Sequence, residues 1–487
     1  MTSKFYVWRS RHSDKRLVGG LDESIVDKHD HEDLASVIDY GSESRNARAK
    51  VGVEVGLDLE RLATIFPDRI PDLILDLAEI AAVTFAIDKS VNRAVDVSGN
   101  PEIDRVNTRN INIQVPVLSK KLATEEAESI VSEIVSHATR DIIDFDFIHH
   151  PPKSPTIIPP SGDQSKQAVS LLSDGIDSTA GVFYNEKRDI DSKYVTLKYT
   201  NGVVPTVNEV SNELVIDPHV FRINLNRGGE FTEFSRGFLH FTYGLIAAIA
   251  SGASKVQSFE NGVAARFLIL QDGWMTTRTV SPFLIGHFNT FTDRVLDQQI
   301  EFTNPFEHLT KTDILNIIPE SHTGIVKKTV SCPHSSNYNF ADQSNCNICI
   351  PCILRTIGIL NSHHDIFIDE MGVCNSFTTA DFTSFEFPPN GQVHKTFGKA
   401  ARKNDEANSP SAYLDGMAEI AYFSRLILTE DKATVRSEYP SMYPDEVYEQ
   451  HKRFAQYFNT AMRELQDRNP TTDAITVDTT RLAPESS

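Results

Sequence analysis

The chain contains 487 residues, of which 40% are hydrophobic and 23% are charged, and its formal net charge at pH 7 is -20. This length predicts two or three domains with a large buried interior. The acidic balance argues against bulk binding of DNA or RNA, because nonspecific affinity for nucleic acids comes from Lys and Arg side chains that neutralise phosphates.

Neither targeting segments nor membrane spans are visible in the sequence. The basic start, MTSKFYVWRSRHSDKR, is not followed by the apolar run of a secretory signal. The most apolar stretches elsewhere are too short, or too often interrupted by charged residues, to cross a bilayer. We therefore expect a cytoplasmic protein without membrane contact.

The first region, residues 1–160, is predicted to be an α+β domain. Hydrophobic periodicity indicates helices over 68–91 and 124–139, and alternation indicates strands over 110–117 and 141–148. A Pro-rich stretch, HHPPKSPTIIPPSGDQS, follows and is the best linker candidate, because Pro removes hydrogen-bond donors and breaks both helix and strand.

The pattern then changes to strands that alternate with helices, which predicts a parallel sheet covered by helices on both faces. We assign this α/β, Rossmann-like core to residues 161–372. Residues 373–468 are predicted to form a helical C-terminal region, and 469–487 a disordered tail. The sequence shows no internal repeat.

The stretch SLLSDGIDSTAG, residues 170–181, runs from a strand through a tight turn into a helix start. Such a turn presents backbone N–H groups and the positive end of the helix dipole to an anion. Hydroxyls of Ser173 and Ser178 are suited to donate to phosphate oxygens, and Asp177 to hold a Mg²⁺ that phosphates share. Alternatively, Asp177 and Ser178 simply cap the helix. From residue types alone, both interpretations stay open.

Four of the five cysteines cluster with the spacing C-x13-C-x2-C-x2-C, and Cys374 stands apart. In a long intracellular chain this cluster favours a metal site over disulfides, and four thiolates suit a tetrahedral, structural Zn²⁺. The alternative is a set of buried, unliganded cysteines that serve as small hydrophobic residues. The predicted zinc ligands are Cys332, Cys346, Cys349 and Cys352.

The turn resembles the S-G-G-x-D-S phosphate loop of the N-type ATP pyrophosphatases, which transfer AMP to a carbonyl or carboxylate. Asp174 departs from the pattern, because that family usually has Gly there. Two explanations are open for Asp174: it adopts a left-handed backbone conformation in place of Gly, or its carboxylate joins Asp177 at Mg²⁺. The resemblance implies ATP binding by Ser173, Asp174, Gly175, Ile176, Asp177, Ser178 and Thr179.

Together with the cysteines, which end in C-x2-C-x2-R, this turn resembles 7-cyano-7-deazaguanine synthase, the QueC family of queuosine biosynthesis. RGFLHFTYGLIAAIASGASKVQSFENG and NPFEHLTKTDILNII are similar to two further segments of that family. The chain is much longer than typical synthases. Its layout is more similar to QueC-like proteins of bacterial anti-phage defence operons, such as QatC and the QueC-like component of some CBASS systems.

The resemblance implies an ATP-pyrophosphatase-type ligase that uses ATP and Mg²⁺ to adenylate a carboxylate, with a 7-deazaguanine-type base as substrate. An amine then displaces AMP, and this amine belongs either to ammonia or to a partner protein encoded in the same operon. Asp177, Arg236 and Lys311 take catalytic roles, while Glu260, Asn261 and Arg278 contact the substrate. The alternatives are a surface charge at Arg236, a turn residue at Glu260 and a capping-region Lys311.

Two rival functions stay open from the sequence. One is a queuosine-pathway nitrile synthase, or another enzyme that modifies a nucleobase or tRNA through the same AMP chemistry. The other is a catalytically degenerate, nucleotide-binding scaffold of a defence complex, and the unusual Asp174 is the feature that supports it.

Overall fold

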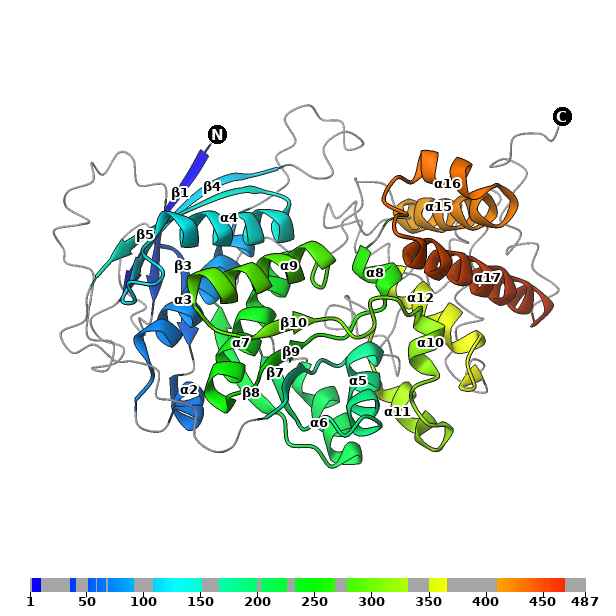
Figure 1. Cartoon of the computed structure of the whole chain (residues 1–487), viewed down its shortest axis with the longest axis horizontal. Helices are drawn as coiled ribbons and strands as arrows, with labels where there is room; N and C mark the ends of the chain where they lie inside the picture. The colour runs from blue at the N-terminus through cyan, green and yellow to red at the C-terminus, as the bar shows by residue number, and fades with distance from the viewer. Residues whose placement is uncertain are drawn as a thin grey trace.

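The structure is a computed structural model, and its strands form one ten-stranded sheet. The sheet order is β10-β9-β6-β7-β8-β3-β2-β1-β4-β5 (Figure 1). The structure describes residues 2–9, 36–40, 51–57, 59–66, 69–91, 108–150, 166–198, 203–225, 233–266, 268, 278–331, 350–365 and 410–468.

The sheet consists of two halves with the same strand order. Within each half, the strands run parallel in the order third-second-first-fourth-fifth, which is the order of the doubly wound α/β folds. The first half contains β1 (Thr2–Arg9), β2 (Ser36–Tyr40), β3 (Val51–Leu57), β4 (Asn110–Val117) and β5 (Ile142–His149). The second half contains β6 (Ala168–Leu171), β7 (Ser192–Lys198), β8 (His219–Leu225), β9 (Lys255–Gln257) and β10 (Glu301–Thr303).

This topology corrects one sequence-based expectation. The first region is not α+β, because its described strands pair in parallel. Hydrophobic alternation reports which face of a strand is buried, but it does not report which strand lies beside it. For the same reason the sequence gives no sign that the two halves share one strand order.

The two halves meet at an antiparallel pair, in which Val55 of β3 lies opposite Leu225 of β8. Helices across this junction reinforce the pairing, since α3 packs against α7 and α4 packs against α9. The corresponding bounds are α2 (Leu59–Ile65), α3 (Asp72–Asp88), α4 (Glu125–Thr139), α7 (Arg236–Ser251) and α9 (Pro282–Thr290). A single buried hydrophobic cluster therefore contains residues of both halves, among them Ile113 and Phe241.

A buried polar network also crosses the junction. Arg109 forms ion pairs of 2.6 Å with both Asp88 and Asp141. Asp88, the last residue of α3, accepts hydrogen bonds from the backbone N–H and the hydroxyl of Ser235, at 2.8 and 2.9 Å. Because Ser235 immediately precedes α7, the first half fixes the point at which that helix begins.

Helices cover both faces of the second half. Crossovers between parallel strands are right-handed, so the helices after β6 and β7 lie on one face and those after β8 and β9 on the other (Figure 1). The first pair is α5 (Ile176–Glu186) and α6 (Val203–Leu214), and the second pair is α7 and α9. Short helices follow β9 and β10: α8 (Gly262–Arg266), the π-helical turn Phe291–Val295, α10 (Lys311–Leu315), the 3-10 turn Glu320–His322, and α11 (Thr323–Lys328).

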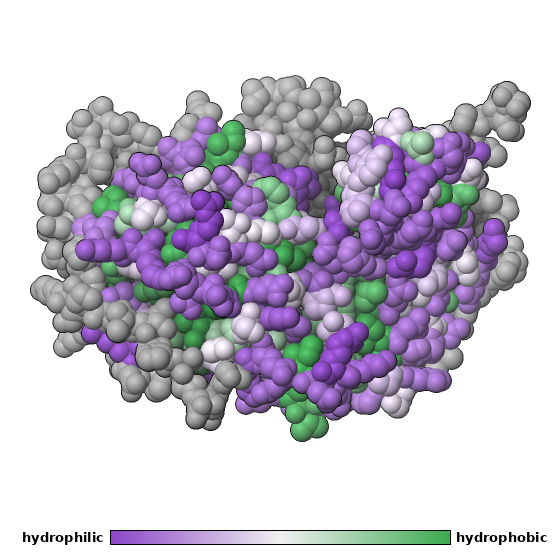
Figure 2. All heavy atoms as spheres, viewed as in Figure 1, coloured by the Kyte–Doolittle hydropathy of each residue, from purple (hydrophilic) through white to green (hydrophobic). Residues whose placement is uncertain are grey.

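The described residues after 349 are mostly helical. They form α12 (Ile350–Leu360), which lies within the core range assigned from the sequence, and then α15 (Pro410–Thr429), α16 (Lys432–Glu438) and α17 (Asp445–Arg468). A second buried cluster joins α15 and α17 to α12, through residues such as Ile353, Phe423 and Phe458. The visible outer surface is mostly hydrophilic (Figure 2). None of the described helices is long and apolar enough to cross a membrane.

Candidate active site at the carboxyl ends of two strands

The candidate site lies where the strand order of the second half reverses. From β6 the chain continues to β7 and β8 on one side, and it returns to β9 on the other side of β6. Ligands of open α/β sheets bind beside the carboxyl ends of the strands at such a switch point. Asp177 follows β6, and Glu260 and Asn261 follow β9, so the fold brings three of the proposed residues to the carboxyl ends of these two neighbouring strands.

Hydroxyl groups hold the turn after β6 in shape. The Ser173 backbone N–H donates to Ser178 Oγ at 3.0 Å, and the two hydroxyl oxygens lie 2.9 Å apart. The Gly175 backbone N–H donates to Ser173 Oγ at 3.1 Å, and the Thr179 hydroxyl donates to the Gly175 carbonyl at 3.0 Å. The first-turn N–H groups of α5 have no intrahelical acceptor and are suited to meet an anion.

The backbone of this turn corrects one explanation for Asp174. Gly175 has a φ of -83°, and Asp174 is not among the described residues with a positive φ. Asp174 therefore does not substitute for Gly in a left-handed conformation. Its carbonyl accepts a hydrogen bond of 2.7 Å from the Val330 backbone N–H, which ties the turn to the segment that follows α11.

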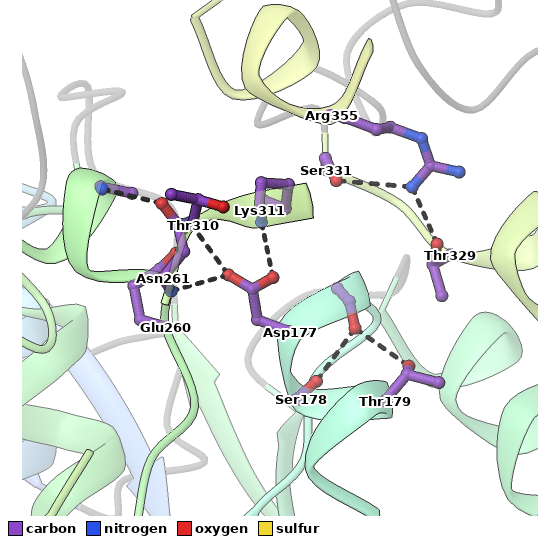
Figure 3. A network of polar contacts seen from close by, with 12 residues as sticks. Asp177, Ser178, Thr179, Glu260, Asn261, Thr310, Lys311, Thr329, Ser331 and Arg355 are labelled. Atoms are coloured by element: carbon purple, nitrogen blue, oxygen red, sulfur yellow. Dashed lines mark hydrogen bonds and ion pairs between the residues drawn. The ribbon is translucent and has the colours of Figure 1, made fainter. Parts of the chain in front are cut away.

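Asp177 is the centre of the polar network drawn in Figure 3. Its Oδ1 accepts a 2.7 Å hydrogen bond and ion pair from Lys311 Nζ. Its Oδ2 accepts two hydrogen bonds of 3.1 Å from Asn261, one from the backbone N–H and one from the side-chain amide. The same amide donates to Glu260 Oε1 at 2.9 Å. A charge-assisted network of this kind holds the buried Asp177 carboxylate in place beside the carboxyl ends of β6 and β9.

The neighbouring carboxyl groups have opposite pKa shifts. Burial alone would raise the pKa of Asp177, but the positive charge of Lys311 and the hydrogen bonds to the carboxylate outweigh burial and lower it. Burial and the negative charge of Asp177 raise the pKa of Glu260 to about 8. Within this pair the proton is therefore favoured on Glu260 and the negative charge on Asp177. Two adjacent carboxyl groups with opposite shifts are typical of sites that perform acid–base chemistry or bind cations.

This shift predicts that Glu260 makes stability depend on pH. Between its ordinary value of 4.5 and about 8, the folded chain holds a proton that the unfolded chain has released, so the contribution of Glu260 to stability falls as pH rises. Glu260→Gln cannot ionise. We expect its melting temperature relative to wild type to increase from about pH 5 to about pH 9, measured by intrinsic fluorescence. Glu301→Gln, at an exposed ion pair, serves as the control; an equal pH trend in both variants would contradict the assignment.

Arg236 is the first residue of α7. Its Nη1 lies 3.7 Å from Glu233 Oε2, and its positive charge acts on the carboxyl groups of both Asp174 and Glu260. Burial raises the pKa of Asp174 despite this charge. On the same helix, burial and the charge of Arg236 lower the pKa of His240 to about 3, so this histidine is neutral at pH 7.

Lys311 is the first residue of α10, and the capping box formed by Thr310 and Asp313 fixes the start of this helix. The Thr310 side chain accepts from the backbone N–H of Asp313, and the Asp313 carboxylate accepts from the backbone N–H of Thr310 at 2.9 Å. Reciprocal caps of this type fix where a helix begins. The lysine side chain, 12% exposed, then reaches across to Asp177.

Arg278 has different neighbours from the other proposed substrate residues. It lies three residues before the Ser281 cap of α9, near His137 of α4. Burial, followed by the charge of Arg278, lowers the pKa of His137 to about 4. The described interactions do not bring Arg278 to Asp177 or Glu260.

Of the predicted zinc ligands, Cys332, Cys346 and Cys349 lie outside the described residues, as does Cys374. Cys352 is fully buried in α12. Among the described residues there is no group of three or more His, Cys, Asp or Glu side chains that could hold a metal ion. The zinc site therefore stays a prediction.

Arg355 is a residue whose role the sequence did not reveal, although it ends the cysteine motif. It is fully buried, and it donates to the Thr329 hydroxyl at 2.8 Å (Figure 3). It also donates to the Val326 carbonyl at 2.5 Å. Both acceptors lie at the carboxyl end of α11, where a helix favours a cation. Burial lowers the pKa of Arg355 to about 10, with Cys352 acting in the opposite direction, so the guanidinium stays charged at neutral pH.

Comparison with models of known protein families gives no match for this chain, and comparison with curated proteins gives none either. The case for a function therefore rests on the residues and the geometry of the site.

Proposed function

We propose that this protein is a QueC-like, ATP-dependent ligase. It adenylates a carboxylate on a 7-deazaguanine-type base and then transfers the activated acyl group to an amine. The observation that carries the proposal is the Asp177 carboxylate, which Lys311 and Asn261 hold at the switch point, in the first turn of the helix that follows the phosphate-type loop. The strand order of the second half supports a Rossmann-like ATP-pyrophosphatase core.

The residues present fit ATP and Mg²⁺. The N-terminal N–H groups of α5 would bind phosphate oxygens of ATP. Asp177 supplies one charged carboxylate, and the adjacent Glu260 could supply a second if it lost its proton when the ion binds. This suits Mg²⁺, because the ion takes few protein carboxylates and completes its shell with water and phosphate oxygens. Bound Mg²⁺ would neutralise phosphate charge. Lys311 and Arg236 place two further positive charges beside the carboxylates, where they would stabilise the pyrophosphate that leaves.

The proposed reaction has two steps. A carboxylate oxygen of the substrate attacks the α-phosphorus of ATP, and the bond to pyrophosphate breaks. An amine nitrogen then attacks the acyl carbon and loses a proton while AMP leaves. Ammonia as the acceptor yields an amide and, with a second ATP, a nitrile. An amine of a partner protein yields a conjugate, which suits the role in bacterial anti-phage defence that the resemblance implies.

Purified protein incubated with ATP, Mg²⁺ and 7-carboxy-7-deazaguanine tests the proposal. Parallel reactions receive ammonium or the proteins encoded beside it, and AMP, pyrophosphate and partner mass are followed. We expect equal amounts of AMP and pyrophosphate, with a mass increase if a protein is the acceptor. Nitrile formation from ammonium alone would favour a queuosine-type synthase, and AMP formation that requires tRNA would favour a tRNA-modifying enzyme. Folded protein that forms no AMP under any condition would favour the nucleotide-binding scaffold.

We also propose that Cys332, Cys346, Cys349 and Cys352 hold a structural Zn²⁺. Four thiolates leave no open position for water, so such a metal would order the loop without entering the reaction. Elemental analysis of purified protein is expected to find about one zinc per chain. Cys346→Ser should lower that content and the thermal stability, because metal binding and local folding are coupled. Cys374→Ser is the matched control, and an equal loss in both variants would contradict the ligand set.

A further inference from the structure

Helix α17, in the C-terminal helical part, presents three polar side chains to the segment that carries Lys311. Gln450, Arg453 and Tyr457 are spaced by three and four residues, so they lie along one face of the helix. All three contact residues between Glu307 and Asp313, more than 130 positions earlier in the chain. Figure 1 shows α17 beside α8 and α12, close to α10.

Gln450 binds the backbone just ahead of α10. It is fully buried, and its amide nitrogen donates to the carbonyls of Glu307 at 3.1 Å and Leu309 at 2.8 Å. The backbone N–H of Gly262 also donates to the Leu309 carbonyl, at 3.0 Å. A Cβ on Gly262 would collide with the Glu307 carbonyl and the Gln450 side chain, so a glycine is required for this close approach.

The other two side chains reach the capping box that begins α10. Arg453 donates to the His308 carbonyl at 2.9 Å and lies 3.6 Å from the Asp313 carboxylate. The Tyr457 hydroxyl donates to the other oxygen of Asp313, at 3.5 Å. Asp313 is the residue that caps Thr310 and so determines where Lys311 stands.

We propose that Gln450, Arg453 and Tyr457 are positioning residues for Lys311, so that the C-terminal helices complete the active site of the second half. The effect of these three residues on catalysis rests on the proposed adenylation, whereas their effect on the position of Lys311 does not. The physical reason is that a lysine side chain is long and flexible. Its ammonium group keeps its ion pair with Asp177 only if the backbone of Lys311, at the start of α10, is held in place.

Gln450→Ala tests the proposal. Gln456→Ala is its control, because it is the same substitution at an exposed position of the same helix. A brief pulse of acetic anhydride, followed by peptide mass spectrometry, measures the accessibility of Lys311 without any nucleotide. Exposed Lys166 gives the internal reference. We expect labelling of Lys311, relative to Lys166, to rise about threefold in Gln450→Ala and to stay unchanged in Gln456→Ala.

Arg453→Gln and Tyr457→Phe repeat the test with less disruptive changes, in case Gln450→Ala does not fold. If wild-type protein forms AMP, these variants are expected to lower kcat about tenfold while KM for ATP stays constant, because Lys311 acts on the leaving pyrophosphate. A general loss of folding would instead raise labelling at every lysine.

The two proposals fail in different ways. Unchanged Lys311 labelling in all three folded variants would overturn the positioning role. Increased labelling in protein that forms no AMP would support the positioning role and count against adenylation.

Discussion

The Asp177→Ala variant is expected to release no measurable AMP from ATP, a loss of at least about a hundredfold relative to wild type. The substitution removes the carboxylate that Lys311 and Asn261 hold at the switch point, and with it the better of the two candidate Mg²⁺ ligands. It also removes the carboxylate that pairs with the ammonium group of Lys311, whose side chain is only 12% exposed. The measurement is AMP and pyrophosphate release under the conditions that support wild-type turnover.

Two variants separate chemistry from folding. Asp177→Asn keeps the size of the side chain and removes its charge, so it should also be inactive while remaining folded. Asp191→Ala changes the same residue type at an exposed position before β7, and should retain activity. Wild-type turnover in Asp177→Ala would show that the turn after β6 is not the phosphate loop.

The second large effect is expected at Arg355. Arg355→Met keeps a long side chain but removes the guanidinium that donates to the Val326 carbonyl and the Thr329 hydroxyl, which still bond to each other at 2.8 Å. This loss of two buried hydrogen bonds predicts a decrease of about 1–3 kcal/mol in the free energy of unfolding. The effect should extend to the phosphate-type turn, because the Val330 backbone N–H donates to the Asp174 carbonyl. Hydrogen exchange followed by mass spectrometry should show faster exchange over residues 326–331 and 173–179.

Arg463→Met is the matched control, since Arg463 is exposed on α17 and surface substitutions usually change stability by less than about 0.5 kcal/mol. If Arg355→Met exchanges as slowly as Arg463→Met in both peptides, Arg355 does not connect the end of α11 to the turn.

Local sequence determined many of the elements and the nature of the turn. The apolar strand, the tight turn and the helix start around Asp177 are all present as expected. So are α3, α4 and α7, whose hydrophobic periodicity and caps act over a few residues. Interactions of this range are encoded by neighbouring residues, which is why they could be predicted from one sequence.

Tertiary structure decided which residues share the site. Asp177 is 84 positions from Asn261 and 134 positions from Lys311, so spacing along the chain cannot show that they touch. The opposite pKa shifts of Asp177 and Glu260 depend on that contact and on burial. Each of these residues was predicted separately from the sequence. The fold brought Asp177, Glu260, Asn261 and Lys311 together, and it placed Arg278 near His137 instead.

The same distinction holds for the whole chain. Sequence by itself determined an acidic α/β protein with a strand, turn and helix around Asp177 and a cysteine cluster. Only the tertiary structure joined its two halves through β3 and β8, buried Arg355 against the end of α11, and placed α17 on the segment that carries Lys311. The physical reason is that strand pairing and other backbone hydrogen bonds between distant segments use N–H and C=O groups of the main chain. Nearly every residue carries these groups, so the pattern of side chains does not predict which segments pair.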